Sequence, residues 1–78
     1  MRSNFHGINS ANQLSQLLQT TRKQQHLSRE ELSGLANVST SFIRDAEQDS
    51  AKCSFGKLVS LMAALGLELQ ADQGRQNE

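Results

Sequence analysis

Apolar and polar positions repeat with a period near four along most of the chain, and between residues 27 and 47 one short corner interrupts this pattern. On either side of the corner the sequence predicts a short helix that begins after a serine. Ser28 can cap the first helix, because Glu31 three residues later completes a capping box. Ser39 can cap the second helix. Asn37 lies at the corner and is expected in the left-handed conformation, which asparagine tolerates better than most residues.

The interior positions around the corner fit two helices that pack on each other. A small residue, Ser33, stands where the two helices are expected to touch. The positions that must be buried are all apolar: Leu32, Ala36, Val38, Ile43 and Ala46. Two helices that meet at such a corner are typical of a helix-turn-helix, whose second helix can enter the major groove of DNA. The alternative is a generic helical hairpin, which does not require the turn residues and the caps to agree.

Two further helices are predicted on either side of this motif. Ser10 followed by Gln13 forms a capping box, so a first helix is expected from there to about residue 25. One face of that helix carries Leu14, Leu17, Leu18 and Thr21. After a polar loop at residues 49–53, a last amphipathic helix is marked by Phe55, Leu58, Val59, Met62 and Leu65. Gly66 ends it, and Leu67 is placed to fold back against its last turn.

The residues after this helix change from a period near four to a period of two, which predicts a strand over residues 67–72. A single strand needs a neighbour for its backbone groups, and nothing else in the sequence alternates in this way. We therefore expect Leu67, Leu69 and Ala71 to pair with the same strand of a second copy across a two-fold axis. The alternative is a frayed extension of the last helix.

Together these elements predict an all-α domain of four or five helices with a short C-terminal strand that pairs across a homodimer. Residues 1–9 are expected to be irregular, residues 10–66 to form the domain, residues 67–72 to form the dimerisation strand and residues 73–78 to be a flexible tail. The chain has 78 residues, no tryptophan or tyrosine and one cysteine, which fits one small domain without an internal disulfide. The sequence shows no leader and no long apolar run, so the expected location is cytoplasmic, with no membrane association.

Eight basic and eight acidic residues give a net charge of zero, which argues against a uniformly basic DNA-binding surface. Any affinity for DNA must come from a few focused cations, doubled by a dimer. The acidic residues could equally serve a protein partner. Cys53, His6 and His26 have neither ligand spacing nor an accompanying carboxylate pattern, and no phosphate-binding loop or nucleophile–base pattern is present. From the sequence we therefore expect a protein that is not an enzyme and that binds no metal and no cofactor.

The chain resembles the Xre/Cro/C1-type DNA-binding domains over about residues 10–66. The resemblance rests on Arg22, Leu27-Ser28, Glu31-Leu32, Asn37-Val38-Ser39, Ile43, Glu47 and the segment LVSLMAALG from Leu58 to Gly66. The segment VSTSFIRDAEQD and the ending LGLELQAD make the chain more similar to HipB-type antitoxins. This resemblance implies a homodimer that binds double-stranded operator DNA and a HipA-type kinase toxin. The chain departs from the family at three positions. It has Ser33 where the family usually has alanine, Asn37 where glycine is usual, and Arg29 where glutamine is usual.

Five residues at the start and on the outward face of the second motif helix are candidates for DNA contacts: Ser39, Thr40, Ser41, Arg44 and Asp45. Arg44 is the best candidate for a base contact, because its fork matches guanine O6 and N7. The alternative is a solvated polar face. The resemblance adds Arg29, at a position where the family contacts a phosphate, and Lys23 is a further basic candidate. The resemblance also implies an ion pair between Arg22 and Glu47, although Arg22 could instead face phosphate.

Two classes of function remain open from the sequence. The first is a sequence-specific DNA-binding repressor, acting either as a HipB-type antitoxin or as a stand-alone Xre-family repressor without a toxin partner. The second is a toxin-neutralising, protein-binding module with weak affinity for DNA. The polar face of the second motif helix favours the first class, and the neutral net charge favours the second.

Overall fold

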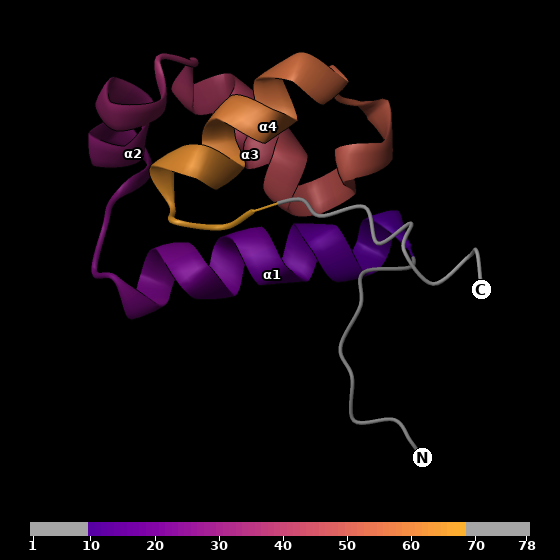
Figure 1. The fold of residues 1–78 in the computed structure, drawn as a ribbon, viewed down its shortest axis with the longest axis horizontal. Coiled ribbons are helices and arrows are strands. Elements are labelled where there is room, and N and C mark those ends of the chain that lie inside the picture. Colours follow the sequence, from indigo (N-terminus) through magenta and orange to yellow (C-terminus); the bar gives the residue numbers. More distant parts are fainter. Residues whose placement is uncertain (1–9, 69–78) are drawn as a thin grey trace, which may run out of the picture.

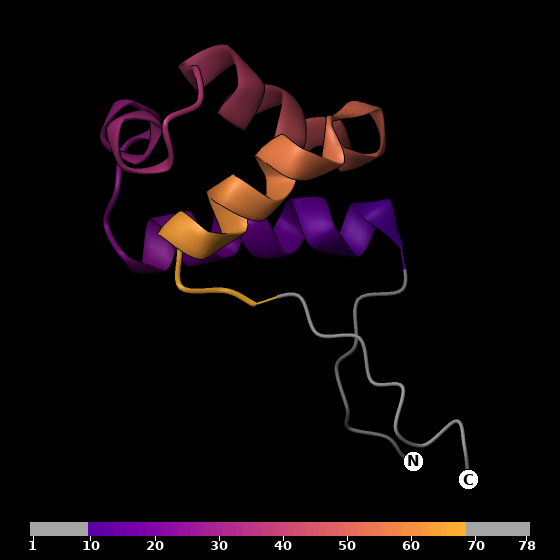
Figure 2. The same ribbon diagram turned by 45° about the horizontal axis from the view of Figure 1, so that its top comes forward.

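The computed structural model describes residues 10–68, which form the helices α1 (Ala11–Gln24), α2 (Arg29–Ala36), α3 (Thr40–Asp49) and α4 (Phe55–Ala64). A 3₁₀ turn, η1 (Ser50–Lys52), joins α3 to α4. In Figure 1, α1 lies along one side of the molecule, the other helices lie across from it, and α4 passes in front of α3. In Figure 2, α2 is seen nearly end-on and α4 runs obliquely over α1. The prediction of an all-α, four-helix domain is confirmed, and residues 10–68 contain no strand.

All four helices begin at a serine whose hydroxyl accepts a backbone hydrogen bond. The donors are the N–H groups of Gln13 for Ser10, Glu31 for Ser28, Phe42 for Ser39 and Lys57 for Ser54. The predicted box at α2 is complete, because the Glu31 carboxylate also accepts from the Ser28 N–H at 2.8 Å. Each cap satisfies an N–H group that the helix leaves unpaired and is typically worth about 1 kcal/mol. Local sequence therefore fixes where each helix starts.

Three helices are followed within two residues by a residue in the left-handed conformation. Asn37 ends α2 with φ of 60° and ψ of 42°, as predicted. After α4, Gly66 has φ of 81°, and the Leu67 N–H donates to the Met62 carbonyl at 2.8 Å, which confirms the predicted fold-back. His26 takes φ of 60° after α1, where a glycine is the usual residue. Within residues 10–68, two of these three left-handed positions are thus held by a residue other than glycine.

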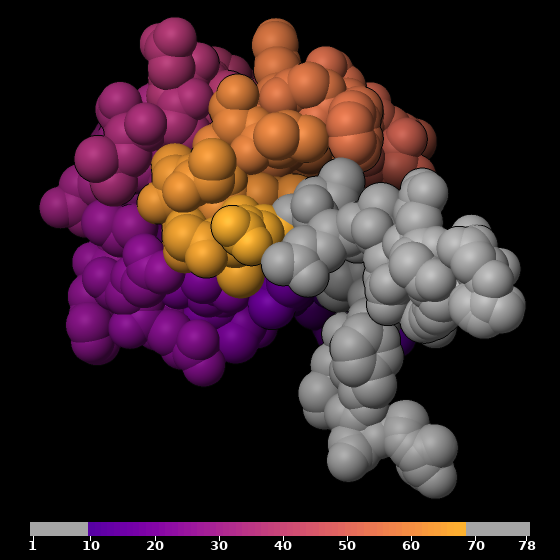
Figure 3. Space-filling model, in the orientation of Figure 1, coloured from indigo at the N-terminus to yellow at the C-terminus, as the bar shows by residue number. Residues whose placement is uncertain are grey.

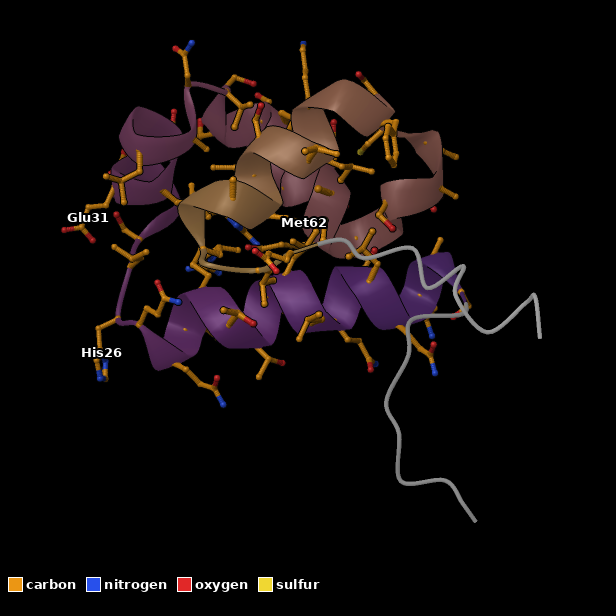
Figure 4. All side chains as sticks on the ribbon, viewed as in Figure 1. His26, Glu31 and Met62 are labelled. Carbon is orange, nitrogen blue, oxygen red and sulfur yellow. The ribbon has the colours of Figure 1, made fainter. Side chains whose placement is uncertain are left out.

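The core lies where the four helices face one another. Its buried apolar residues are Leu18, Leu32, Ala36, Ile43, Ala46, Leu58, Leu61, Met62 and Leu65. Figure 4 shows Met62 in the space between α4 and α1. Burial of such side chains supplies most of the stability of so small a domain, because each buried leucine, isoleucine or methionine contributes roughly 1.5–3 kcal/mol. Every helix contributes to this core, so α2 and α3 are held in place by α1 and α4.

The face that α4 buries differs from the face that the apolar spacing suggests. Phe55 is 67% exposed and Val59 is 39% exposed, whereas Leu61 is fully buried. Phe55 and Val59 lie one turn apart, and together with Ala63 and Leu67 they line a shallow apolar groove. We refer to these four residues as the α4 patch. Figure 3 shows the orange and yellow surface of α4 and of residues 65–68 on this face of the molecule. The apolar face of α4 is therefore wider than the part of it that packs against the rest of the domain.

Most of the predicted C-terminal strand lies outside the described residues. Leu67 is within them, and it is partly buried against the core of its own chain. Leu69 and Ala71 lie outside residues 10–68, as do the segments 1–9 and 73–78. The strand pairing therefore stays a prediction.

Candidate nucleic-acid interface

Helix α3 divides into a buried face and an exposed polar face. Ile43, Ala46 and Glu47 face the interior. The five residues predicted to contact DNA, Ser39, Thr40, Ser41, Arg44 and Asp45, are all exposed. Ser39 accepts a hydrogen bond from the Phe42 N–H at 3.0 Å, so its hydroxyl is the cap of the helix. The first two turns of α3 thus present hydroxyl, guanidinium and carboxylate groups to the outside on a fixed helical frame.

Arg44 and Asp45 form a loose ion pair on this face. The Arg44 Nε and the Asp45 Oδ1 are 3.7 Å apart, and the two side chains are 54% and 60% exposed. Exposed pairs of this kind contribute about 0–1 kcal/mol. The guanidinium therefore remains available to a ligand, and the neighbouring carboxylate weakens the attraction of this face for phosphate.

Arg22 on α1 and Glu47 on α3 are brought together in the interior. The Arg22 Nε donates to Glu47 Oε2 at 2.6 Å, and its Nη2 donates to Oε1 at 3.2 Å. The remaining Nη1 donates to the Leu27 carbonyl at 2.9 Å. A buried pair of this kind adds little net stability, because desolvation offsets the attraction, but it fixes orientation. It joins the end of α1 to α3 and to the segment that leads into α2.

A second arginine, Arg29, shares the same carboxylate, a contact that the sequence does not predict. The Nε and Nη2 of Arg29 donate to Glu47 Oε1 at 3.2 and 3.0 Å. The Arg29 side chain is 37% exposed, whereas that of Glu47 is 1% exposed. Two guanidinium groups against one carboxylate leave one net positive charge in the cluster. The only sequence sign of this contact is an arginine where the resembled family usually has glutamine.

A shallow hollow opens beside this cluster, where the N-termini of α2 and α3 approach each other. Its lining consists of Arg22, Ser28, Arg29, Glu30 and Thr40. Two of the predicted DNA-contact residues, Arg29 and Thr40, therefore share one surface. Lys23 is exposed in the last turn of α1 and does not line the hollow.

Three side-chain hydrogen bonds, one local and two between distant segments, hold the elements that carry this surface. The Ser33 hydroxyl on α2 donates to the Val38 carbonyl across the corner. Ser15 and Ser50 are both buried, and the Ser50 N–H donates to the Ser15 hydroxyl at 2.9 Å. The Gln25 amide donates to the Leu65 carbonyl at 2.8 Å. The last two bonds tie the end of α3 and the end of α4 to α1.

Cys53 lies beside the acidic end of α3. Burial raises the pKa of its thiol, and the Asp45 and Asp49 carboxylates raise it further. A raised pKa keeps the sulfur in the thiol form, which is the poorer nucleophile and metal ligand. Within residues 10–68 no group of three His, Cys, Asp or Glu side chains is arranged to hold a metal ion.

The fold and the exposed first turns of α3 define a helix-turn-helix DNA-binding domain. The helix-turn-helix family model matches residues 18–71, and the chain belongs to this family. No curated protein matches the sequence. In the described part of the chain, no helix is long and apolar enough to cross a membrane.

Several solved structures share the fold at 19% sequence identity. One is a HipA–HipB–O2–O3 complex, with a TM-score of 0.80 over 86% of this chain and 94% of that chain. A HipB–O4 20mer complex gives a TM-score of 0.79 over 86% of this chain and 94% of that chain. A structure described as an MDT protein gives a TM-score of 0.80 with the same coverage of both chains. At this level of identity the comparison shows a common fold.

Proposed function

We propose that this protein is a sequence-specific transcriptional repressor that serves as the antitoxin of a HipA-type kinase in a toxin–antitoxin operon. The observation that carries the proposal is the exposed polar face of α3, formed by Ser39, Thr40, Ser41, Arg44 and Asp45, on a helix-turn-helix frame. The antitoxin part is supported by the shared fold with HipB in a HipA–HipB complex. The expected site of action is the cytoplasm.

In this proposal α3 lies in the major groove of operator DNA, and the hollow beside it faces the phosphate backbone of the DNA. Arg44 reads a guanine through O6 and N7, and Asp45 is placed to accept from a cytosine N4. The hydroxyls of Thr40 and Ser41 are short donors for phosphate or base edges. Arg29 and Lys23 supply positive charge to the backbone, because contacts with phosphates provide most of the sequence-independent affinity.

The operator-binding form is proposed to be a homodimer. The α4 patch leaves apolar surface exposed on this chain, with Phe55 at 67% and Val59 at 39%. The patch ends at Leu67, from which the predicted dimerisation strand through Leu69 and Ala71 would continue. A second copy fits this surface, because a two-fold axis would bring both patches and both strands together. A dimer also places two α3 helices on successive half-sites of a palindrome.

The test is a DNase footprint on the DNA upstream of the protein's own gene, with and without the product of the neighbouring gene. The proposal predicts a protected palindrome, and co-purification of the neighbouring kinase with the protected complex. Protection of a palindrome without any partner would identify a stand-alone repressor. Kinase binding without protection of any DNA would identify a protein-neutralising module and would contradict the repressor role.

A further inference from the structure

Glu47 binds two arginines, one buried and one at the surface. Its Oε2 accepts only from Arg22, but its Oε1 accepts from both Arg22 and Arg29. Arg22 is satisfied by Glu47 and by the Leu27 carbonyl, so its contacts are internal. Arg29, the first residue of α2, contacts the same oxygen from the surface. One buried carboxylate thus connects the interior of the domain to a surface cation.

Part of the Arg29 guanidinium remains exposed and available to bind a ligand. Among the contacts within residues 10–68, Nε and Nη2 bind Glu47, and Nη1 has no acceptor. The side chain is 37% exposed and lines the hollow together with Ser28 and Thr40. Guanidinium is planar, so fixing one edge against Glu47 also fixes the direction in which the free N–H groups point.

We infer that Glu47 is a positioning residue for DNA binding, which holds the Arg29 guanidinium ready for a backbone phosphate without touching the DNA. This inference rests on the proposed function and adds to it the residue that preorganises one contact. An arginine that is free in solution loses its rotamer freedom on binding, which lowers affinity about two- to tenfold. Glu47 removes this loss, because it immobilises Arg29 before the DNA arrives. Its own charge is neutralised by Arg22, so the cluster still attracts an anion.

The experiment is a double-mutant cycle of Glu47→Asp and Arg29→Gln, with the protected upstream duplex as probe. Glu47→Asp keeps the negative charge but shortens the side chain by one methylene, so one carboxylate can no longer reach both arginines. Arg29→Gln removes the guanidinium that Glu47 is proposed to position. Binding is measured by fluorescence anisotropy at several salt concentrations, and Tm is measured for all four proteins. Glu30→Asp is the matched control, because it makes the same change to an exposed residue that lines the same hollow.

Glu47→Asp is expected to weaken binding about two- to tenfold when Arg29 is present. In the Arg29→Gln background the same change should have little effect on affinity, although it still lowers Tm there, because it also disturbs the pair with Arg22. Arg29→Gln should reduce the salt dependence of log K by about one per protomer, the value for one phosphate contact. Glu47→Asp should leave that salt dependence unchanged, since no charge is lost.

Two results would overturn the inference and leave the proposed function standing. One is an equal loss of affinity from Glu47→Asp in both backgrounds, which would mean that Glu47 acts only through the packing of α3. The other is an unchanged affinity of the Glu47→Asp protein, which would mean that Arg29 needs no positioning. Failure of the unmodified protein to bind any duplex would overturn the proposed function and this inference together.

Discussion

The Ser33 hydroxyl on α2 donates a hydrogen bond to the carbonyl of Val38, on the other side of the corner that leads into α3. Asn37, in the left-handed conformation, lies between them, and its own N–H donates back to the Ser33 carbonyl at 2.9 Å. The two bonds close the corner from both directions. The angle between α2 and α3, on which docking of the motif depends, is therefore held partly by one side-chain hydroxyl.

Replacing Ser33 with alanine is expected to destabilise the domain by about 0.5–1.5 kcal/mol, the net value of one hydrogen bond. From sequence alone, alanine at this position would be tolerated or mildly stabilising, because it is the better helix former. The bond to Val38 reverses that expectation. Urea unfolding measures the change, and Ser60→Ala, at an exposed site on α4, corrects for helix propensity. Equal effects of the two substitutions would show that the hydroxyl contributes nothing.

The left-handed residue after α1 offers a stabilising substitution. His26 has φ of 60°, which costs a residue with a Cβ about 1–2 kcal/mol, whereas glycine pays roughly 0.5–1 kcal/mol in entropy. Figure 4 shows the His26 side chain pointing away from the helices, so little packing is lost with it. We expect His26→Gly to raise stability by about 0.5–1 kcal/mol. Asn37→Gly should gain less, since asparagine tolerates this conformation, and the same unfolding measurement compares the two.

The accuracy of the sequence-based predictions follows the range of the interactions involved. The caps at Ser28 and Ser39 and the left-handed Asn37 depend on contacts three or four residues apart, and sequence spacing shows these directly. The contact between Arg29 and Glu47 joins residues 18 positions apart. The bond between Ser15 and Ser50 spans 35 positions. Such contacts depend on how the helices pack, which spacing does not determine.

The α4 helix shows the same limit in another form. Apolar residues at Phe55, Leu58, Val59, Met62 and Leu65 correctly predict a helix. Their spacing describes an apolar arc, but it does not say how much of that arc a small domain can cover. The core covers Leu58, Leu61, Met62 and Leu65, and it leaves Phe55 and Val59 outside. At the DNA-binding site, likewise, the sequence indicates which residues lie on α3 but not how their charges pair.

Arg44→Ala is expected to weaken binding to the operator by about 1–3 kcal/mol and to relax the preference at one base pair, the usual effect of losing a bidentate base contact. Anisotropy titrations with operator variants substituted one base pair at a time measure both effects. An equal loss on the operator and on random duplex would assign Arg44 to the DNA backbone instead.

Asp45→Asn provides the complementary test of charge on the same face. The Asp45 carboxylate is 60% exposed and 3.7 Å from Arg44, so it opposes phosphate and competes for the guanidinium. Removing its charge should raise affinity for random duplex DNA and lower the ratio of specific to non-specific binding. Titrations with operator and random duplexes at one salt concentration give that ratio. An increased ratio would contradict a role of Asp45 in discriminating the operator from other DNA.

The dimer proposal leads to a prediction that separates the α4 patch from the C-terminal strand. Phe55→Asp places a charge on a side chain that is 67% exposed, so it should change the stability of the single protomer little. If the patch lies in the dimer interface, the substitution should convert dimer to monomer, because a buried unpaired charge is costly. Leu35→Asp on α2 is the matched control, since Leu35 is 63% exposed and lies outside the patch.

A truncation after Glu68 removes Leu69 and Ala71 but keeps Leu67, whose N–H bond to Met62 belongs to the end of α4. Multi-angle light scattering should give a monomer for the truncated chain if strand pairing is required, and a dimer if the patch is sufficient. Loss of the dimer in both variants would indicate that the patch and the strand form one continuous interface. A dimer that survives both changes would place the interface on another face, and a monomeric unmodified chain would contradict the proposed two-fold assembly on operator DNA.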